Sequence, residues 1–179
     1  MAVRRIINMG HPNLRQVAKP VPEAMLASEE ITRLIADMQD TLRDYGGIGL
    51  AAPQIDVPLR LAIVEIPGGP TRYGQLAPMP LTTFINPSIE VLDDRCAGFW
   101  EGCLSVPGLR GFVTRPQHVR VRYTDIEGQS VSLEQKGFPA TVFQHEFDHL
   151  DGRLFIDRMD DMSQLMFEAE FDKYGPIGD

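Results

Sequence analysis

Five consecutive residues late in the chain, His145-Glu146-Phe147-Asp148-His149, limit its fold and chemistry more than any other feature. In an α-helix, residues four apart lie about 40° apart around the axis and about 6 Å apart along it. The two imidazoles then share one face and can bind the same metal ion. Glu146 follows the first imidazole directly, so its carboxylate can exchange a proton with a water on that ion without binding the ion itself. The pentad therefore predicts a helix that carries a hydrolytic metal site.

A catalytic metal site of this type needs a third protein ligand and keeps a fourth position open. The extended metalloprotease pattern fails here, because it requires a third histidine at the position of Phe155. Neighbouring aspartates on the predicted helix lie on poor faces, whereas a thiolate is a strong ligand for a borderline metal. The remaining candidates for the third ligand are Cys103, Glu168, Glu170, Asp148 and Asp151.

Two further stretches carry residues of chemical interest. Cys103 lies in Glu101–Ser105, but a lone cysteine is more often a small buried hydrophobic residue, which is what we expect of Cys96. The stretch 47–54 is rich in small residues that permit a close backbone approach, and Gln54 supplies an amide that can donate to an oxyanion. Taken alone, a glycine-rich stretch after a helix is usually only a turn.

Hydrophobic periodicity predicts three helices. Ser28 can cap the first of them, and Pro139 suits the first position of the second, where a missing N–H is not needed. Gly46 and Gly47 are expected to end the first helix. The predicted helices cover residues 28–45, 139–150 and 161–174.

Short strands are predicted between the first two helices. Val119, Val121 and Tyr123 alternate with arginines, which indicates a half-exposed strand, and the proline- and glycine-rich segment 67–80 is expected to be a loop. Because strands and helices do not alternate regularly, we predict an α+β fold. Its antiparallel sheets surround a central metal-binding helix, with an N-terminal and a C-terminal helix. The predicted strands cover residues 61–64, 84–85, 89–92, 119–123 and 131–133.

The composition excludes several classes of protein. The chain of 179 residues is expected to form a single catalytic domain over 1–179. Its net charge of −8 argues against a broad phosphate-binding face, so we expect no DNA partner. Two cysteines are too few for a disulfide scaffold, and no apolar run approaches a membrane span or a signal peptide. These features predict a cytoplasmic protein without a membrane partner.

Three stretches taken together resemble the signature motifs of the peptide deformylases, in the order in which that family carries them. The resemblance extends from about residue 4 to residue 170, and Leu104 followed by Val106-Pro107-Gly108 is typical of the bacterial form. The segment 67–80 looks longer than in the shortest bacterial members. The three stretches are Gly47–Gln54, Glu101–Ser105 and Gln144–His149.

The resemblance implies an activity and a ligand set. The family removes the formyl group from the N-terminal formylmethionine of new polypeptides and releases formate. By this resemblance Cys103, His145 and His149 bind one divalent metal ion, and water fills the fourth position. Glu146 is implied to be the general base and then the general acid, because the amine that leaves needs a proton.

The same resemblance implies the residues that hold the substrate. The side-chain amide of Gln54 and the backbone N–H of Leu104 are expected to stabilise the oxyanion. The substrate backbone is expected to run as an extended strand along the first motif, where Gly49 is a backbone contact. The apolar lining of the methionine pocket is expected to come from Ile48, Phe138 and Val142.

Charged and amide residues near the motifs are expected to support the site. We predict that Glu101 and Arg115 pair to hold the Cys103 segment. Gln144 and Asp148 are candidates to orient the metal-binding imidazoles, since such rings usually donate their other N–H to a carboxylate or carbonyl. Arg110 is a candidate for the wall of the substrate groove.

The resemblance also implies the cofactor and partners. A cysteine and two histidines suit both Zn²⁺ and Fe²⁺. Resemblance to the bacterial members favours Fe²⁺ in the cell, with Zn²⁺, Ni²⁺ or Co²⁺ in preparations. The expected partners are N-formylmethionyl nascent polypeptides, with a transient ribosome contact by family analogy, and the expected oligomeric state is a monomer.

Overall fold

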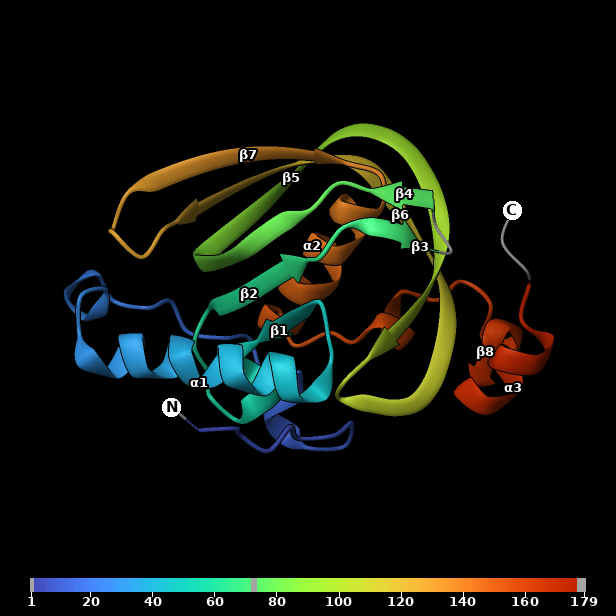
Figure 1. Ribbon diagram of the computed structural model, residues 1–179, viewed down its shortest axis with the longest axis horizontal. Helices are drawn as coiled ribbons and strands as arrows, with labels where there is room; N and C mark the ends of the chain where they lie inside the picture. Colours follow the sequence, from blue (N-terminus) through green and yellow to red (C-terminus); the bar gives the residue numbers. More distant parts are fainter. Residues whose placement is uncertain (1, 72–73, 177–179) are drawn as a thin grey trace.

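The computed structural model describes residues 2–71 and 74–176. Its α-helices are α1 (Glu29–Tyr45), α2 (Phe138–Leu150) and α3 (Glu168–Tyr174). Its strands are β1 (Gly49–Ala51), β2 (Leu61–Ile66), β3 (Gly69–Thr71), β4 (Gly74–Leu76), β5 (Met79–Cys103), β6 (Val106–Thr124), β7 (Ser130–Lys136) and β8 (Leu165–Phe167). A curved antiparallel sheet in the order β1-β2-β5-β6-β7 encloses α2, and α1 lies outside β1 and β2 (Figure 1). The predicted α+β fold is confirmed.

Helix α1 forms as its sequence predicts. The Ser28 hydroxyl accepts a hydrogen bond from the Ile31 backbone N–H at 3.3 Å, and Gly46 ends the helix with a φ of 71°, which favours glycine. Its apolar stripe packs against alternate residues of β1 and β2, including Leu50 and Ile63. The intervening residues of the same two strands face α2. The first two strands are therefore buried on both faces.

Helix α2 begins at Phe138, with Pro139 one position further in than predicted. A positive φ of 66° at Gly137 turns the chain from β7 into this helix. Phe84 of β5 packs edge-on against Phe143 and Phe147 of the helix. These buried contacts fix the rotation of α2 about its axis, which decides where its histidines point.

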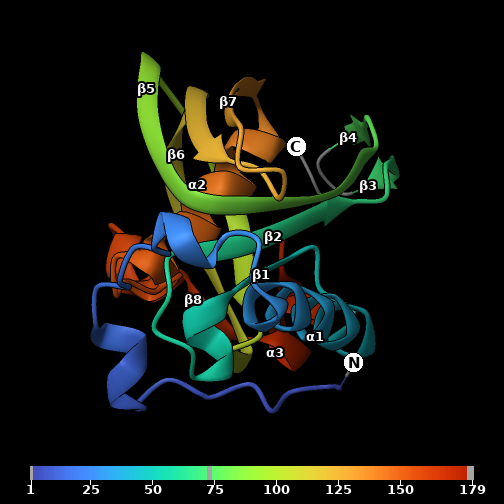
Figure 2. The ribbon, with the colours of Figure 1, turned by 90° about the vertical axis from the view of Figure 1, so that its left-hand side faces the viewer.

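The strands predicted at 84–85 and 89–92 are both present, but the break predicted between them is wrong, because they belong to one long strand, β5. Figure 2 shows β5 as a strongly bent strand that passes in front of α2. The bend occurs where Asn86 adopts a φ of 50° and the register shifts between Ile85 and Ser88. The Asn86 side chain bonds the backbone N–H and carbonyl of Val21, which stabilises this conformation. Strand β5 pairs with β2 before this bulge and with β6 after it, so the strand continues through it.

Two other predicted segments differ in the structure. The segment 67–80 is not simply a loop: β3 and β4 pair within it, while residues 72–73 lie outside the described residues. The helix predicted over 161–174 is wrong in its first half, where a 3₁₀ turn precedes β8. Strand β8 pairs with β6 at 109–111, because β7 reaches only as far as His118 and leaves that edge of β6 unpaired. Among the described residues, none of the helices is both long and apolar enough to span a membrane.

Asp37 of α1 anchors the N-terminal segment. Burial alone would raise the pKa of its carboxyl, but hydrogen bonds from the Arg4 side chain and the Ala2 backbone N–H, both at 2.8 Å, lower it. The carboxylate therefore stabilises the fold above its unfolded pKa of about 3.9, and this stabilisation is lost as the pH falls through the folded value.

We expect Asp37→Asn to lower the free energy of unfolding at pH 7 by about 2 kcal/mol, the usual contribution of hydrogen bonds to a charged group. The difference from the parent should shrink toward pH 3. Denaturant unfolding at both pH values measures it, with Asp44→Asn at an exposed position of the same helix as the control. A difference independent of pH would show that the carboxylate charge is not what stabilises the contact.

Candidate metal centre

Three side chains from distant parts of the sequence converge beside α2. The Sγ atom of Cys103 and one ring nitrogen each from His145 and His149 all lie within 4.8 Å of one another. Cys103 ends β5, and a two-residue turn connects it to β6. Its Sγ lies 3.2 Å from Nε2 of His149. The expected convergence of a mid-chain sulfur with the two imidazoles is therefore present.

The other candidate ligands point elsewhere. Glu168 accepts two hydrogen bonds from Arg110, and Asp151 accepts one from Arg60 at 2.6 Å. Asp148 is held by Arg115 and Arg158, and Glu170 is exposed on α3. Within the part of the chain that the structure describes, the cysteine and two histidines are the one group of side chains arranged to hold a metal ion.

The electrostatics of the group favour a thiolate. Burial alone would raise the pKa of the Cys103 thiol, but the positive charge of the adjacent His149 and the hydrogen bonds from both rings lower it to about 5. Burial would lower the pKa of His145, and its hydrogen bonds to Cys103 and Glu101 raise it instead. The site is thus built to hold positive charge against a half-buried thiolate.

These residues fit a divalent cation. The Nδ1 atom of His145 bonds Oε2 of Glu101 at 2.7 Å, so its Nε2 remains available as a ligand. The Oε2 atom of Glu146 is buried and has no hydrogen-bond partner among the described residues. One thiolate and two imidazoles form a donor set typical of Zn²⁺ and Fe²⁺.

Glu146 lies next to the three converging side chains, with only 5% of its surface exposed. Burial is the main reason that its pKa rises to about 7, and the positive charges of His145 and His149 limit the rise. A carboxyl group with a pKa near neutrality can both accept and donate a proton at physiological pH. The position and the chemistry suit the predicted role.

Gly49 makes room for this carboxyl group. A Cβ atom built at position 49 would lie only 2.3 Å from Oε1 of Glu146. No side chain larger than hydrogen fits there while Glu146 keeps its place. Besides the predicted backbone contact with a substrate, Gly49 therefore has a steric role that the sequence did not indicate.

We expect Gly49→Ala to reduce catalytic turnover by about 10²-fold, because the added methyl group displaces Glu146 by an ångström or more. Metal content should stay near that of the parent, since the three atoms nearest to the new methyl group all belong to Glu146 and not to a candidate ligand. Steady-state kinetics and metal analysis on the same sample test this. Normal turnover would mean that the position of Glu146 does not matter.

The Gln54 amide is fixed in orientation. Its Oε1 accepts a hydrogen bond from the Ala51 backbone N–H at 2.8 Å, which directs Nε2 toward Ser105 Oγ at 3.2 Å and Cys103 Sγ at 3.6 Å. Leu104 occupies the first position of the two-residue turn directly after Cys103. Both residues line the cleft, so the two predicted oxyanion donors lie beside the converging side chains.

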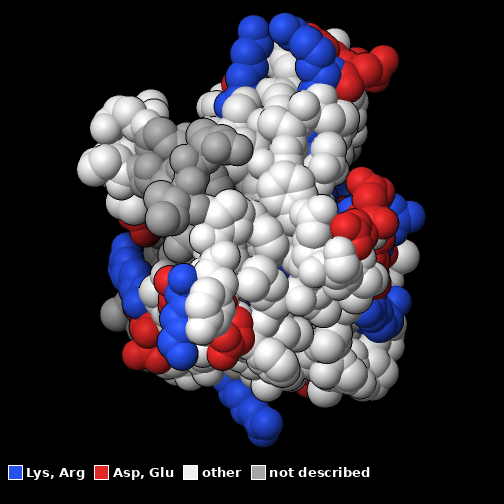
Figure 3. Space-filling view, turned by 90° about the vertical axis from the view of Figure 1, so that its right-hand side faces the viewer, with Lys and Arg blue, Asp and Glu red and all other residues white. Residues whose placement is uncertain are grey.

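A cleft of about 880 Å³ opens beside the candidate metal ligands. It contains the predicted pocket residues Ile48, Phe138 and Val142, and Arg110 also lies along it, paired with Glu168. Figure 3 shows the side of the molecule toward the C-terminal elements as a largely uncharged surface with charged side chains gathered near its edges.

Two parts of the cleft were not predicted. Trp100 lines it and lies directly before the second motif, so an aromatic residue at that position was the available signal. The N-terminal segment also borders it, because the backbone N–H of Ile7 bonds the carbonyl of Gln54 and that of Met9 bonds the carbonyl of Ser105. No pattern in the sequence of that segment indicates this contact.

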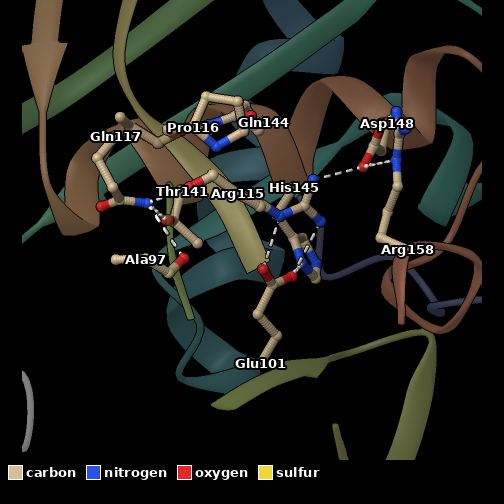
Figure 4. A network of polar contacts seen from close by, with 11 residues as sticks. Ala97, Glu101, Arg115, Pro116, Gln117, Thr141, Gln144, His145, Asp148 and Arg158 are labelled. Carbon is tan, nitrogen blue, oxygen red and sulfur yellow. Dashed lines mark hydrogen bonds and ion pairs between the residues drawn. The ribbon is translucent and has the colours of Figure 1, made fainter. Parts of the chain in front are cut away.

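A buried ion-pair network supports the group (Figure 4). The predicted pair of Glu101 and Arg115 is present, with Arg115 Nε 2.7 Å from Oε1 of Glu101. Burial would raise the pKa of Glu101, but hydrogen bonds from His145 and Arg115 lower it, so the carboxylate stays charged. Gln144 does not contact the imidazoles; its amide bonds the carbonyls of Pro116 and Ala140 and joins α2 to β6.

Comparisons with known proteins agree with this site. The family model described as polypeptide deformylase matches residues 3–165. Peptide deformylase 1 of Prochlorococcus marinus is 45% identical, over 99% of this chain and 91% of its own length. Peptide deformylase 2 of Pseudomonas syringae is 46% identical, over 92% of each chain.

Solved structures give the same result. A crystal structure of the class I type b peptide deformylase of Acinetobacter baumannii with bound Met-Ala-Ser superposes with a TM-score of 0.82. The two chains are 36% identical, and the match covers 88% of this chain and 99% of that one. From the family model, the curated relatives and the shared fold it follows that this chain is an enzyme of the peptide deformylase family.

Proposed function

We propose that this enzyme hydrolyses the formyl group from the N-terminal formylmethionine of newly synthesised polypeptides. Water and the formyl amide give formate and a free amine. The observation that carries the proposal is the convergence of Cys103, His145 and His149 beside the buried Glu146, in a cleft of a chain that belongs to the deformylase family. The bound Met-Ala-Ser in the Acinetobacter enzyme has the composition of a deformylated product.

In this proposal Cys103, His145 and His149 hold one divalent cation. When bound, the cation supplies a Lewis acid that lowers the pKa of water and stabilises negative charge on the formyl oxygen. We assign Fe²⁺ in the cell by resemblance to the bacterial members of the family, with Zn²⁺, Ni²⁺ or Co²⁺ in purified preparations. Glu101 holds His145 through Nδ1 and so keeps Nε2 directed at the cation site.

Glu146 moves the proton. Its carboxylate accepts a proton from the attacking water and delivers it to the amine nitrogen as the C–N bond breaks, so the base of the first step is the acid of the second. The raised pKa suits both steps, because neither the charged nor the neutral form is strongly disfavoured near neutral pH. Burial keeps bulk water from competing for the proton.

The Gln54 amide and the Leu104 backbone N–H stabilise the oxyanion that forms on the formyl oxygen. The orientation of Gln54 is preset by its bond to Ala51, so no reorganisation is needed when charge develops. Removal of one such donor from other hydrolases costs about 3–4 kcal/mol of transition-state stabilisation.

The peptide binds as an extended strand along β1, where Gly49 offers its backbone. The methionine side chain enters the apolar part of the cleft lined by Ile48, Phe138 and Val142. We place the enzyme in the cytoplasm as a monomer with a single catalytic domain over 1–179, in transient contact with the ribosome, where its nascent substrates emerge.

Formate release from formyl-Met-Ala-Ser tests the proposed function. The enzyme is prepared without oxygen and supplied in turn with Fe²⁺, Ni²⁺ and Zn²⁺, because Fe²⁺ sites with a thiolate ligand oxidise readily. We expect formate in stoichiometric amount with the new amine. Acetyl-Met-Ala-Ser serves as the control for formyl selectivity. If none of the three metals supports formate release, the proposed function is wrong.

A further inference from the structure

The short 3₁₀ helix η4 (Phe155–Arg158) lies outside all three signature motifs, yet both of its ends contact residues of the metal-binding helix. At its start, the buried ring of Phe155 stacks on the imidazole of His145, with centroids 6.3 Å apart and an interplanar angle of 15°. At its end, Arg158 donates hydrogen bonds to both oxygens of Asp148, at 2.5 and 3.1 Å. One short element therefore meets α2 at two places.

The second contact continues toward His145 through an unbroken series of ion pairs (Figure 4). Asp148 also accepts a hydrogen bond from Arg115 at 2.8 Å, and Arg115 donates two to Glu101, at 2.7 and 3.1 Å. Glu101 in turn bonds Nδ1 of His145 at 2.7 Å. Hydrogen bonds therefore connect the partly exposed guanidinium of Arg158 to the candidate metal ligand His145 without interruption.

The charges in this series balance only when Arg158 is counted. Glu101 and Asp148 are both buried, and each accepts hydrogen bonds from an arginine side chain. Two buried carboxylates thus face two guanidiniums, one of them fully buried and shared between both acids. Without Arg158, the Arg115 guanidinium alone would pair with two buried negative charges. Any shift of Arg115 toward Asp148 would then weaken its hydrogen bonds to Glu101.

We propose that η4 is a positioning element for His145, in which Phe155 fixes the plane of the ring and Arg158 fixes Glu101 through Asp148 and Arg115. This inference rests on the proposed role of His145 as a metal ligand. Arg158 touches neither substrate nor metal in this assignment; it sets the direction from which Nε2 of His145 meets the cation. Its removal therefore acts on metal affinity and kcat more than on KM.

Metal affinity is the decisive measurement, because it does not require turnover. Metal-free protein competes with a chelator of known strength for Zn²⁺, and the visible spectrum of the Co²⁺-loaded protein reports ligand geometry. We expect R158A to weaken Zn²⁺ binding by about 10–100-fold, as is usual for loss of an outer-sphere partner. In Fe²⁺-loaded protein, kcat for formyl-Met-Ala-Ser should fall while KM stays within about twofold. Phe155→Leu keeps apolar volume but loses the stacked ring. It should change the Co²⁺ spectrum as R158A does.

Two further variants separate positioning from simple stabilisation. R158K keeps the positive charge but loses the two-point contact, so it should recover part of the lost affinity and remains measurable if R158A does not fold. R95A removes an exposed guanidinium that pairs with Asp93 and should leave metal affinity unchanged. If the Arg158 and Phe155 variants lower the unfolding temperature but keep the parent Zn²⁺ affinity and Co²⁺ spectrum, η4 merely stabilises the fold and the proposal is overturned. Absence of deformylase activity in the parent would overturn the proposed function instead and leave this readout intact.

Discussion

Replacing Glu146 by glutamine is expected to lower kcat for formyl-Met-Ala-Ser by about 10²–10⁴-fold, the usual contribution of a positioned acid–base group. Glutamine has the same shape as glutamate, so it fits the space beside Gly49 and disturbs neither the cleft nor the candidate ligands. It cannot accept the proton of the attacking water or return it to the amine. Steady-state kinetics on metal-loaded protein give the comparison.

The control for this variant is Glu170→Gln, which removes the same charge at an exposed position of α3. Glu146→Gln should keep its bound metal, because the three candidate ligands are unchanged. It should also unfold at a similar or higher temperature. Turnover within a factor of ten of the parent would show that Glu146 is not the general base.

The residues of the candidate site could be predicted because they occur in short local patterns. His145 and His149 share a helix face through their spacing alone, and geometry then requires only that α2 form. Cys103 is different, since the residues by themselves left Glu168 open as the third ligand. The resemblance to the family favoured the cysteine. The structure adds a physical reason, because the Glu168 carboxylate already forms an ion pair with Arg110.

The parts of the fold that escaped prediction depend on pairing between distant segments. The sequence Asn86-Pro87 is a typical strand breaker, yet β5 continues through it because β2 pairs with the residues before it and β6 with the residues after it. The periodicity of 161–174 predicts a helix throughout. The unpaired edge of β6 instead draws Leu165–Phe167 into a strand and leaves the Phe167 side chain 69% exposed. Local patterns carry no information about a free strand edge elsewhere in the chain.

The supporting residues show the same limit. Glu101 and Arg115 could be paired from the sequence because both flank the cysteine hairpin. Arg158 could not, since it reaches Asp148 only after the chain has folded back over α2 through η4. Trp100 was missed for a related reason, because its side chain lines the cleft only through the way β5 curves around the helix.

Cys103→Ala and Glu168→Ala are expected to separate the two assignments of the third ligand. Loss of an outer-sphere partner alone weakens metal binding by about 10–100-fold, so loss of a ligand should weaken Zn²⁺ binding by at least about 100-fold. Cys103→Ala should therefore lose its metal in a chelator competition and lose turnover with it. Glu168→Ala should keep both, because its carboxylate is bound to Arg110 and lies outside the converging group.

The metal-free proteins provide the comparison that makes this test decisive. Cys103→Ala removes a half-buried thiolate that faces two imidazoles, so the metal-free variant should lose an interaction that raises the pKa of His145. NMR titration of that ring then reports a lower pKa than in the metal-free parent, whereas Glu168→Ala leaves it unchanged. Metal affinity and the pKa of His145 should both fall in Cys103→Ala. Neither should change in Glu168→Ala. Tight metal binding by Cys103→Ala with loss of metal from Glu168→Ala would reverse the assignment and make the chain a carboxylate-liganded hydrolase.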